Sequence, residues 1–166
     1  MTTYQPDPDT ISTQNLSSSE LTKELTENAT GSNHVEVIET VISSLQQDES
    51  AMVSHKDAGY LWKFKYGSVE VFVQLTGLTD EDTFTAWSSV LKLPAQNEAQ
   101  LMRRLLEMNW SDTFEARFCI FEEQVAVSST RTVAELSPGE ISRVITVVAT
   151  IADNNDDALQ AEFGAA

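Results

Sequence analysis

The residue best suited to nucleophilic or redox chemistry in this sequence is its single cysteine, Cys119, in the stretch RFCIFEEQVAVSS. A catalytic thiol needs a nearby base and an electropositive setting that lowers its pKa. We expect one of the two histidines, His34, at a helix start and the other, His55, in a turn, so neither is placed to reach the thiol. Arg117, on the same strand face, could lower the pKa of the thiol modestly. We therefore interpret Cys119 as a structural residue, with a thiol-based redox sensor as the less favoured alternative.

Acidic residues near the C-terminus have the opening spacing of a calcium loop. Asp153, Asn155 and Asp157 would be the first three ligands of an EF-hand. Such a loop also needs glycine at its sixth position and a bidentate glutamate at its twelfth. Those positions hold Ala158 and Gly164. The motif fails, and the sequence predicts no metal site.

The other candidate catalytic groups lie in unsuitable surroundings or lack the required motif. The pair Glu122-Glu123 falls in an expected hairpin turn, where water keeps a carboxylate ionised and unsuited to general acid catalysis. Asp80-Glu81-Asp82 is interpreted as a solvated loop. No glycine-rich phosphate loop and no nucleophile elbow is present. We expect no catalytic residues, no cofactor and no enzymatic activity.

The periodicity of apolar residues predicts an α+β fold. Helical stripes are expected at about 34–47, at 96–109 and from Ser137 onward, where SPGE has the form of a capping box. Alternating strands fall between them, and turns such as Gly67-Ser68 are short enough for hairpins. The prediction is an antiparallel sheet of about five strands with three helices, in the order α-β-β-β-α-β-β-α.

Composition divides the chain into three parts. Residues 1–32 are rich in Ser, Thr, Asn and Gln and are expected to form a disordered polar tail. Residues 33–153 form the expected α+β domain. Residues 154–166 are expected to be an acidic helix extension or tail, because DNNDD (153–157) is poor helix material that could fray or kink the last helix.

The net charge of −16, from 26 acidic and 10 basic residues, argues against several partners. Such a chain repels phosphate backbones and anionic lipid surfaces, so nucleic-acid and membrane binding are not expected. No apolar run is long enough for a membrane span and no secretory signal opens the sequence, so we expect a cytoplasmic location. An acidic mimic that occupies a basic partner protein remains an alternative function.

Two aromatic residues lie on strand faces that are otherwise polar. Phe72 alternates with Glu70 and Gln74, and Phe121 shares its face with Cys119 and Arg117. An aromatic stripe on a polar face suggests contact with a dimer partner or a client protein. The competing interpretation is that the helix at 96–109, which carries Met102, covers that face. Met102 itself is an adaptable packing residue for either setting.

The segment from Glu98 to Asn154 resembles the YbjN family, and its cyanobacterial branch above all. The features that carry the resemblance are a helix ending near Trp110, the sequence ARF, a short acidic turn and LSPGE opening the final helix. The segment WKFKYGSVEVFVQLTG is similar to the central hairpin of that family. The resemblance extends over about 35–153.

The resemblance implies the fold of type III secretion chaperones, which often pair as homodimers, and it implies no catalytic residues. Chaperones of that fold bind partly unfolded client segments, which for this chain is an analogy of fold alone. The function expected from the sequence is a non-enzymatic protein-binding module, chaperone-like or an assembly or regulatory factor. It would act on a protein client as a homodimer, and the candidate interaction residues are Phe72, Phe121, Cys119, Arg117 and Met102.

Overall fold

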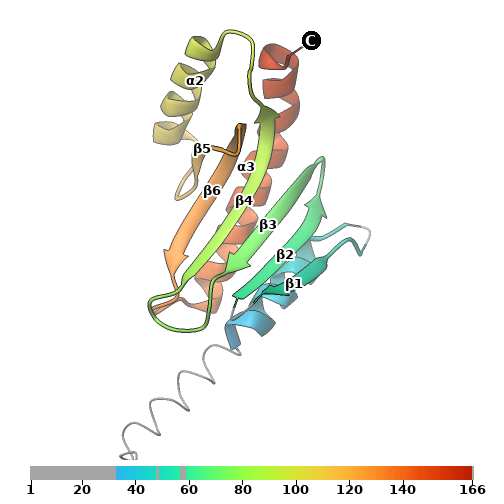
Figure 1. The fold of residues 1–166 in the computed structure, drawn as a ribbon, viewed down its shortest axis with the longest axis vertical. Helices are drawn as coiled ribbons and strands as arrows, with labels where there is room; N and C mark the ends of the chain where they lie inside the picture. Colours follow the sequence, from blue (N-terminus) through green and yellow to red (C-terminus); the bar gives the residue numbers. More distant parts are fainter. Residues whose placement is uncertain (1–32, 48, 57–58, 166) are drawn as a thin grey trace, which may run out of the picture.

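The computed structural model describes residues 33–47, 49–56 and 59–165 (Figure 1). The elements follow the predicted order, with six strands where about five were expected, because the short segment after residue 51 pairs fully with its neighbour. A helix covering residues 33–45 is followed by β1 (Met52–Lys56), β2 (Gly59–Tyr66), β3 (Val69–Leu75), β4 (Thr83–Lys92), α2 (Glu98–Ser111), β5 (Arg117–Phe121), β6 (Gln124–Thr132) and α3 (Pro138–Phe163).

The strands form one antiparallel sheet in the order β1-β2-β3-β4-β6-β5. Tight turns join β2 to β3 and β5 to β6, as the alternation of the sequence predicts. The chain crosses from one half of the sheet to the other through α2, so β4 and β6 become central neighbours. β1 and β5 are left as the two edge strands. The fold is therefore the predicted α+β class.

Alternate side chains of the strands form a buried face, which we call the helix side. They point toward α3, which lies behind β3, β4 and β6 in Figure 1. In β3, and in β4 as far as Val90, a period of two separates buried from less buried positions, as pleated strands require. An irregularity in the register between Ser89 and Leu91 then leaves Val90 and Leu91 both buried. The buried members on this side of the central strands are Val69, Val71, Val73, Leu75, Phe84, Ala86, Ser88, Val90, Leu91, Val125, Val127 and Ser129.

The final helix begins as predicted and runs further than predicted. Ser137 is the N-cap of α3, and its side chain forms a reciprocal capping box with Glu140. The helix continues unbroken through DNNDD, where fraying or a kink was expected. Two of these acidic residues are used in packing: Asp153 accepts a hydrogen bond from the Ser68 backbone N–H at 2.7 Å, and Asp156 accepts one from its hydroxyl at 2.9 Å. Tertiary contacts therefore override the poor helix propensity.

The helix at residues 33–45 also packs on the helix side of the sheet. His34 lies at the start of this helix, as the sequence predicts, but its side chain is buried rather than solvated, with only 2% exposed. Its Nε2 lies 2.8 Å from the Leu136 carbonyl oxygen, just ahead of α3. His55 was expected in a turn and instead lies within β1, with its ring 4.7 Å from that of Tyr60.

The segment before β5 differs from what alternation predicts, which is a strand over about 114–121 with Phe114, Ala116, Phe118 and Ile120 on one face. The strand starts only at Arg117, because residues before it form a turn in which Phe114 has a positive φ of 52°. Ala116 and Phe118 are buried, while Phe114 and Ile120 are exposed.

The turn between β2 and β3 generates a stability prediction. Gly67 has a φ of 54°, and a Cβ built on it would lie 1.9 Å from Asp153 Oδ1. We expect Gly67→Ala to lower the free energy of unfolding by about 1–3 kcal/mol, from the left-handed backbone and the displaced carboxylate together. Urea unfolding followed by circular dichroism measures this change.

Gly139, in the first turn of α3, is the matched control. A Cβ there would meet only the Ser137 hydroxyl at 4.0 Å, and its φ is not positive. Gly139→Ala should leave stability unchanged or raise it by about 0.4–1 kcal/mol. Equal destabilisation by the two substitutions would contradict the role given to the Gly67 turn.

Candidate protein-interaction site

The face of the sheet opposite the helix side is the candidate site, and we call it the open face. Figure 1 views the sheet from this side, with α3 behind the strands. None of the described helices lies over it. The interpretation in which the helix at 96–109 covers this face is therefore wrong, because α2 packs beside β5 and the C-terminal end of α3.

A straight line of side chains crosses the open face perpendicular to the strands. The pairing register aligns one residue from each of the six strands, and we call this line the central row: Met52, Lys63, Phe72, Trp87, Ser128 and Arg117. In its middle, Phe72 and Trp87 stack with ring centroids 5.3 Å apart. Lys63 Nζ lies 5.6 Å from the centroid of the Phe72 ring, within the range of a cation–π contact.

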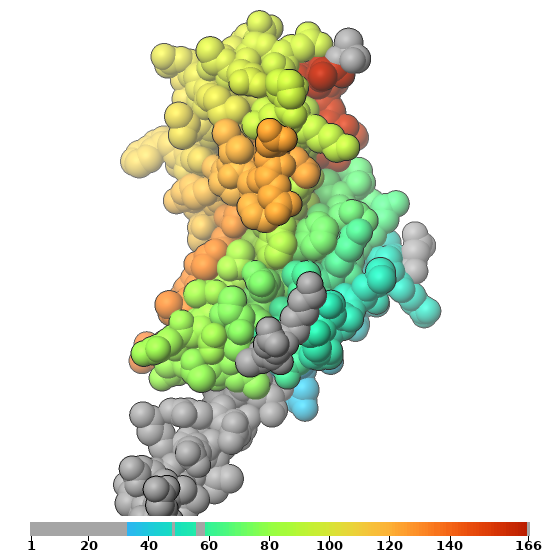
Figure 2. Space-filling view, viewed as in Figure 1, coloured from blue at the N-terminus to red at the C-terminus, as the bar shows by residue number. Residues whose placement is uncertain are grey.

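Phe121 extends the aromatic surface from the neighbouring hairpin. Its ring meets Trp87 edge-on, at 6.2 Å between centroids, and its side chain is 47% exposed. The atoms at the β5–β6 turn rise in front of the sheet in the centre of the space-filling view, in orange (Figure 2). The hairpin thus forms a raised wall beside the flat middle of the sheet.

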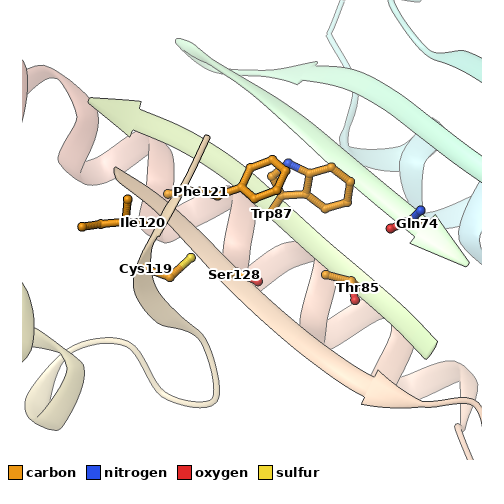
Figure 3. A pocket seen from close by; sticks show the side chains of 8 residues that line it. Gln74, Thr85, Trp87, Cys119, Ile120, Phe121 and Ser128 are labelled. Atoms are coloured by element: carbon orange, nitrogen blue, oxygen red, sulfur yellow. The ribbon is translucent and has the colours of Figure 1, made fainter. Parts of the chain in front are cut away.

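Between this wall and the sheet lies a hollow of about 220 Å³ (Figure 3). Its lining is mostly apolar, with hydroxyl and amide groups at its margin; the lining residues are Gln74, Thr85, Trp87, Cys119, Ile120, Phe121, Ala126 and Ser128. The volume is smaller than the 300–1,000 Å³ typical of small-molecule sites. It suits a single large side chain of a protein partner.

The geometry around Cys119 disfavours thiol chemistry. The cysteine is free, and partial burial raises the pKa of its thiol. The expected lowering by Arg117 does not occur, because the guanidinium turns to the carbonyl oxygens of Phe114 and Ala116 and the hydroxyl of Thr113. Cys119 therefore serves as an apolar wall of the hollow.

The five predicted interaction residues are only partly brought together. Phe121 and Cys119 line the hollow, while Phe72 and Arg117 belong to the central row that borders it. Met102 does not join them. It is half-buried on α2 and packs against the hydrophobic core.

Sequence reasoning missed Trp87, which joins Phe72 to Phe121. Large aromatic residues in a small sheet are expected to lie mostly in the core, and Trp87 is one of them. The signal was available in the alternation of TFTAWSSVLK: with Phe84 and Ala86 on the helix side, Trp87 falls on the other face. Lys63 was missed because its contact with Phe72 depends on the cross-strand register.

A second apolar surface lies on the outer side of α2, and we call it the α2 ridge. It consists of Leu106, Trp110 and Phe114, which are 69%, 92% and 72% exposed. Leu106 and Trp110 are four residues apart, so they lie on the same side of the helix, and Phe114 follows its end. The apolar stripe predicted for this helix is thus divided, with Leu101 and Leu105 buried and Leu106 turned outward.

Two classes of site are not found in the described part of the chain. Among residues 33–47, 49–56 and 59–165, no group of three or more His, Cys, Asp or Glu side chains could hold a metal ion. Within the same residues, none of the helices combines the length and apolar composition needed to cross a bilayer.

Comparison with known families assigns the chain. Residues 34–161 match the sequence model of the YbjN family, which is described as "Putative bacterial sensory transduction regulator". The chain belongs to the YbjN family. The YbjN match includes every strand of the sheet and α2, and hence both the open face and the α2 ridge.

A solved structure and the curated proteins were also compared with this YbjN-family chain. The crystal structure of the ExsC-ExsE complex contains a similar chain, with 15% sequence identity and a TM-score of 0.41. The similarity covers 67% of the YbjN-family chain and 79% of that chain. The comparison with curated proteins finds no match.

The raised pKa of Cys119 predicts a slow thiol. At any pH below its pKa, a raised pKa means a smaller thiolate fraction, and only the thiolate is alkylated. Iodoacetamide should therefore modify Cys119 of the full chain more slowly than it modifies a free model thiol at the same pH. Mass spectrometry measures the rate without ambiguity, because the sequence has one cysteine. A rate above that of the model thiol would revive the redox-sensor alternative.

Proposed function

We propose that this YbjN-family chain is a non-enzymatic protein-binding module, chaperone-like or regulatory, that holds a protein client on the open face. The proposal includes the cytoplasmic location predicted from the sequence and a homodimeric state. The assignment to the cyanobacterial branch of the family likewise stays a prediction. The observation that carries the proposal is the aromatic centre of the open face, Phe72, Trp87 and Phe121, beside a hollow of side-chain size.

Physical considerations favour a protein as the occupant of this face. Protein interfaces are enriched in large aromatic anchors that fill pockets near the centre of the contact. Trp87 has that position, flanked by aromatic rings on both sides. The hydroxyl and amide groups of Thr85, Gln74 and Ser128 offer hydrogen bonds at the margin of the hollow. The flat middle of the sheet accepts an extended or helical segment.

Site-specific crosslinking tests the proposal directly. A photoreactive phenylalanine analogue replaces Phe121, and client proteins captured in the native host are identified by mass spectrometry. We expect Trp87→Ala to weaken capture by roughly tenfold to a hundredfold, the effect of removing a central aromatic anchor. Circular dichroism and urea unfolding of the variant confirm that it remains folded.

Trp110→Ala provides the matched control, since it removes the same side chain from a different surface. The indole of Trp110 is 92% exposed on the α2 ridge, so its loss leaves the open face intact. Crosslinking from position 121 should persist in this variant. Capture that is indifferent to Trp87→Ala would argue against the open face as the client site.

The α2 ridge supports the homodimer. An exposed cluster of three large apolar residues, two on α2 and one just after it, is a candidate for contact with a second copy, because a twofold axis lets one patch cover itself. We expect Trp110→Ala to shift the chain toward the monomer in light-scattering measurements, and Trp87→Ala to leave the oligomeric state unchanged.

Salt provides a second readout of the dimer. Each copy has a formal charge of −16, so two copies repel each other and added salt screens that repulsion. The dimer should become stronger between low and moderate ionic strength. A full-length chain that remains monomeric at every salt concentration would contradict this part of the proposal.

A further inference from the structure

We infer that the partner segment held on the open face is acidic at both ends and apolar in its middle, although the chain itself is strongly acidic. The inference rests on the proposed client-binding function and adds the chemistry of the client. It predicts the opposite of what the net charge of −16 suggests, namely that a basic partner would be preferred.

Charge is divided unevenly between the strands and the rest of the chain. All six strands together contain one of the 26 acidic residues, Glu70. The same strands contain six of the ten basic residues, which are Lys56, Lys63, Lys65, Lys92, Arg117 and Arg131. The acidic excess therefore belongs to the helices, the loops and the N-terminal segment, while the sheet is basic.

The strand register places most of this basic charge on the open face. Lys63 and Lys65 flank Phe72 and Glu70 in the pairing of β2 with β3, and Lys92 pairs with Gln124 on the same side as Phe121. The one acidic residue is already neutralised, because Lys63 Nζ lies 2.7 Å from Glu70 Oε1. The Arg117 guanidinium donates from Nη1 to uncharged oxygens, and among the described residues no carboxylate is paired with it.

The central row fixes the spacing of the partner's charges. Lys63 on β2 and Arg117 on β5 lie on either side of Phe72, Trp87 and Ser128, four strand spacings apart. At about 4.8 Å per spacing the two cations are separated by roughly 19 Å. An extended segment spans that distance in about six residues, at roughly 3.3 Å each. A segment with acidic residues at such a separation can pair with Arg117 at one end. At the other end it can pair with Lys65, or with Lys63 in place of Glu70, while an apolar side chain enters the hollow.

Acidic turns at the ends of the strands determine the direction in which the segment lies. Asp80, Glu81 and Asp82 follow β3 at one end of the sheet, and Glu122 and Glu123 join β5 to β6 at the other. A segment with acidic ends that ran along the strands would meet these turns and be repelled. A segment laid across the strands, along the central row, avoids both. Charge and aromatic contacts thus favour the same orientation.

Two synthetic peptides test the inference with the full chain. The first has the sequence Glu-Glu-Ser-Leu-Phe-Leu-Ser-Glu-Glu, and the second replaces each Glu by Lys. Fluorescence anisotropy of the labelled peptides measures binding. We expect the acidic peptide to bind at least roughly fivefold to tenfold more tightly than the basic peptide. The Glu residues at each end form exposed ion pairs with the basic side chains of the open face, whereas Lys residues there are repelled. Tighter binding of the basic peptide would overturn the inference.

Substitutions locate the effect on the open face. Lys65→Gln and Lys63→Gln should each weaken the acidic peptide by roughly twofold to fivefold, the contribution of one exposed ion pair. Arg103→Gln is the matched control, because it removes the same unit of charge from an 80% exposed side chain on α2. An equal loss in Arg103→Gln would show that only total charge matters and would also overturn the inference.

The crosslinking assay tests the client site, and the peptide assay tests its preference for acidic segments, so the two can be contradicted separately. If crosslinking from position 121 depends on Trp87 while neither peptide binds, or the basic peptide binds better, the client site stands and its acidic preference is wrong. If crosslinking is indifferent to Trp87→Ala, the proposed client site itself is wrong. Trp87→Ala should weaken the acidic peptide as well, because the aromatic middle of the peptide requires the same hollow.

Discussion

The packing of α3 against β3, β4 and β6 is the constraint on which the rest of the structure depends. Among the described helices it is α3 that covers the middle of the sheet, and its apolar face requires apolar side chains at every second strand position. That requirement assigns all remaining strand positions to the other face. The open face, its aromatic row and its basic charge are therefore consequences of where one helix lies. The buried contact of Asp156 with Ser68 holds the β2–β3 turn against the same helix.

Much of the fold follows from local patterns in the sequence. The order of elements could be predicted because strand alternation and helical stripes are unambiguous in this chain, and SPGE marks the start of α3 through a capping box that the structure contains. The course of α3 through DNNDD could not be predicted from propensity. Asp153 and Asp156 are poor helix formers in isolation, and only their contacts with Ser68, about ninety residues away in sequence, explain their places.

The candidate site was predictable in part, for a related physical reason. The alternation of side chains along a strand shows which of its residues share a face, so the sequence places Phe72, Phe121 and Cys119 on the more polar faces of their strands. Alternation does not show whether a helix covers that face, and it does not show which residues of neighbouring strands pair with each other. Trp87 and Lys63 enter the central row only through the register between strands. The course of the Arg117 side chain was equally out of reach, because its partners lie in an irregular turn after α2.

The concentration of basic residues in the strands has a further consequence, for the solubility of the protein. A sheet with partly exposed aromatic rings and two edge strands, β1 and β5 in the described residues, is a template for stacking and for edge-to-edge aggregation. Two open faces brought together would oppose lysine to lysine, and Arg117 stands at the start of the β5 edge. The charges on the strands thus act as gatekeepers against aggregation. They keep other copies of the chain away from a surface that must stay accessible to a partner.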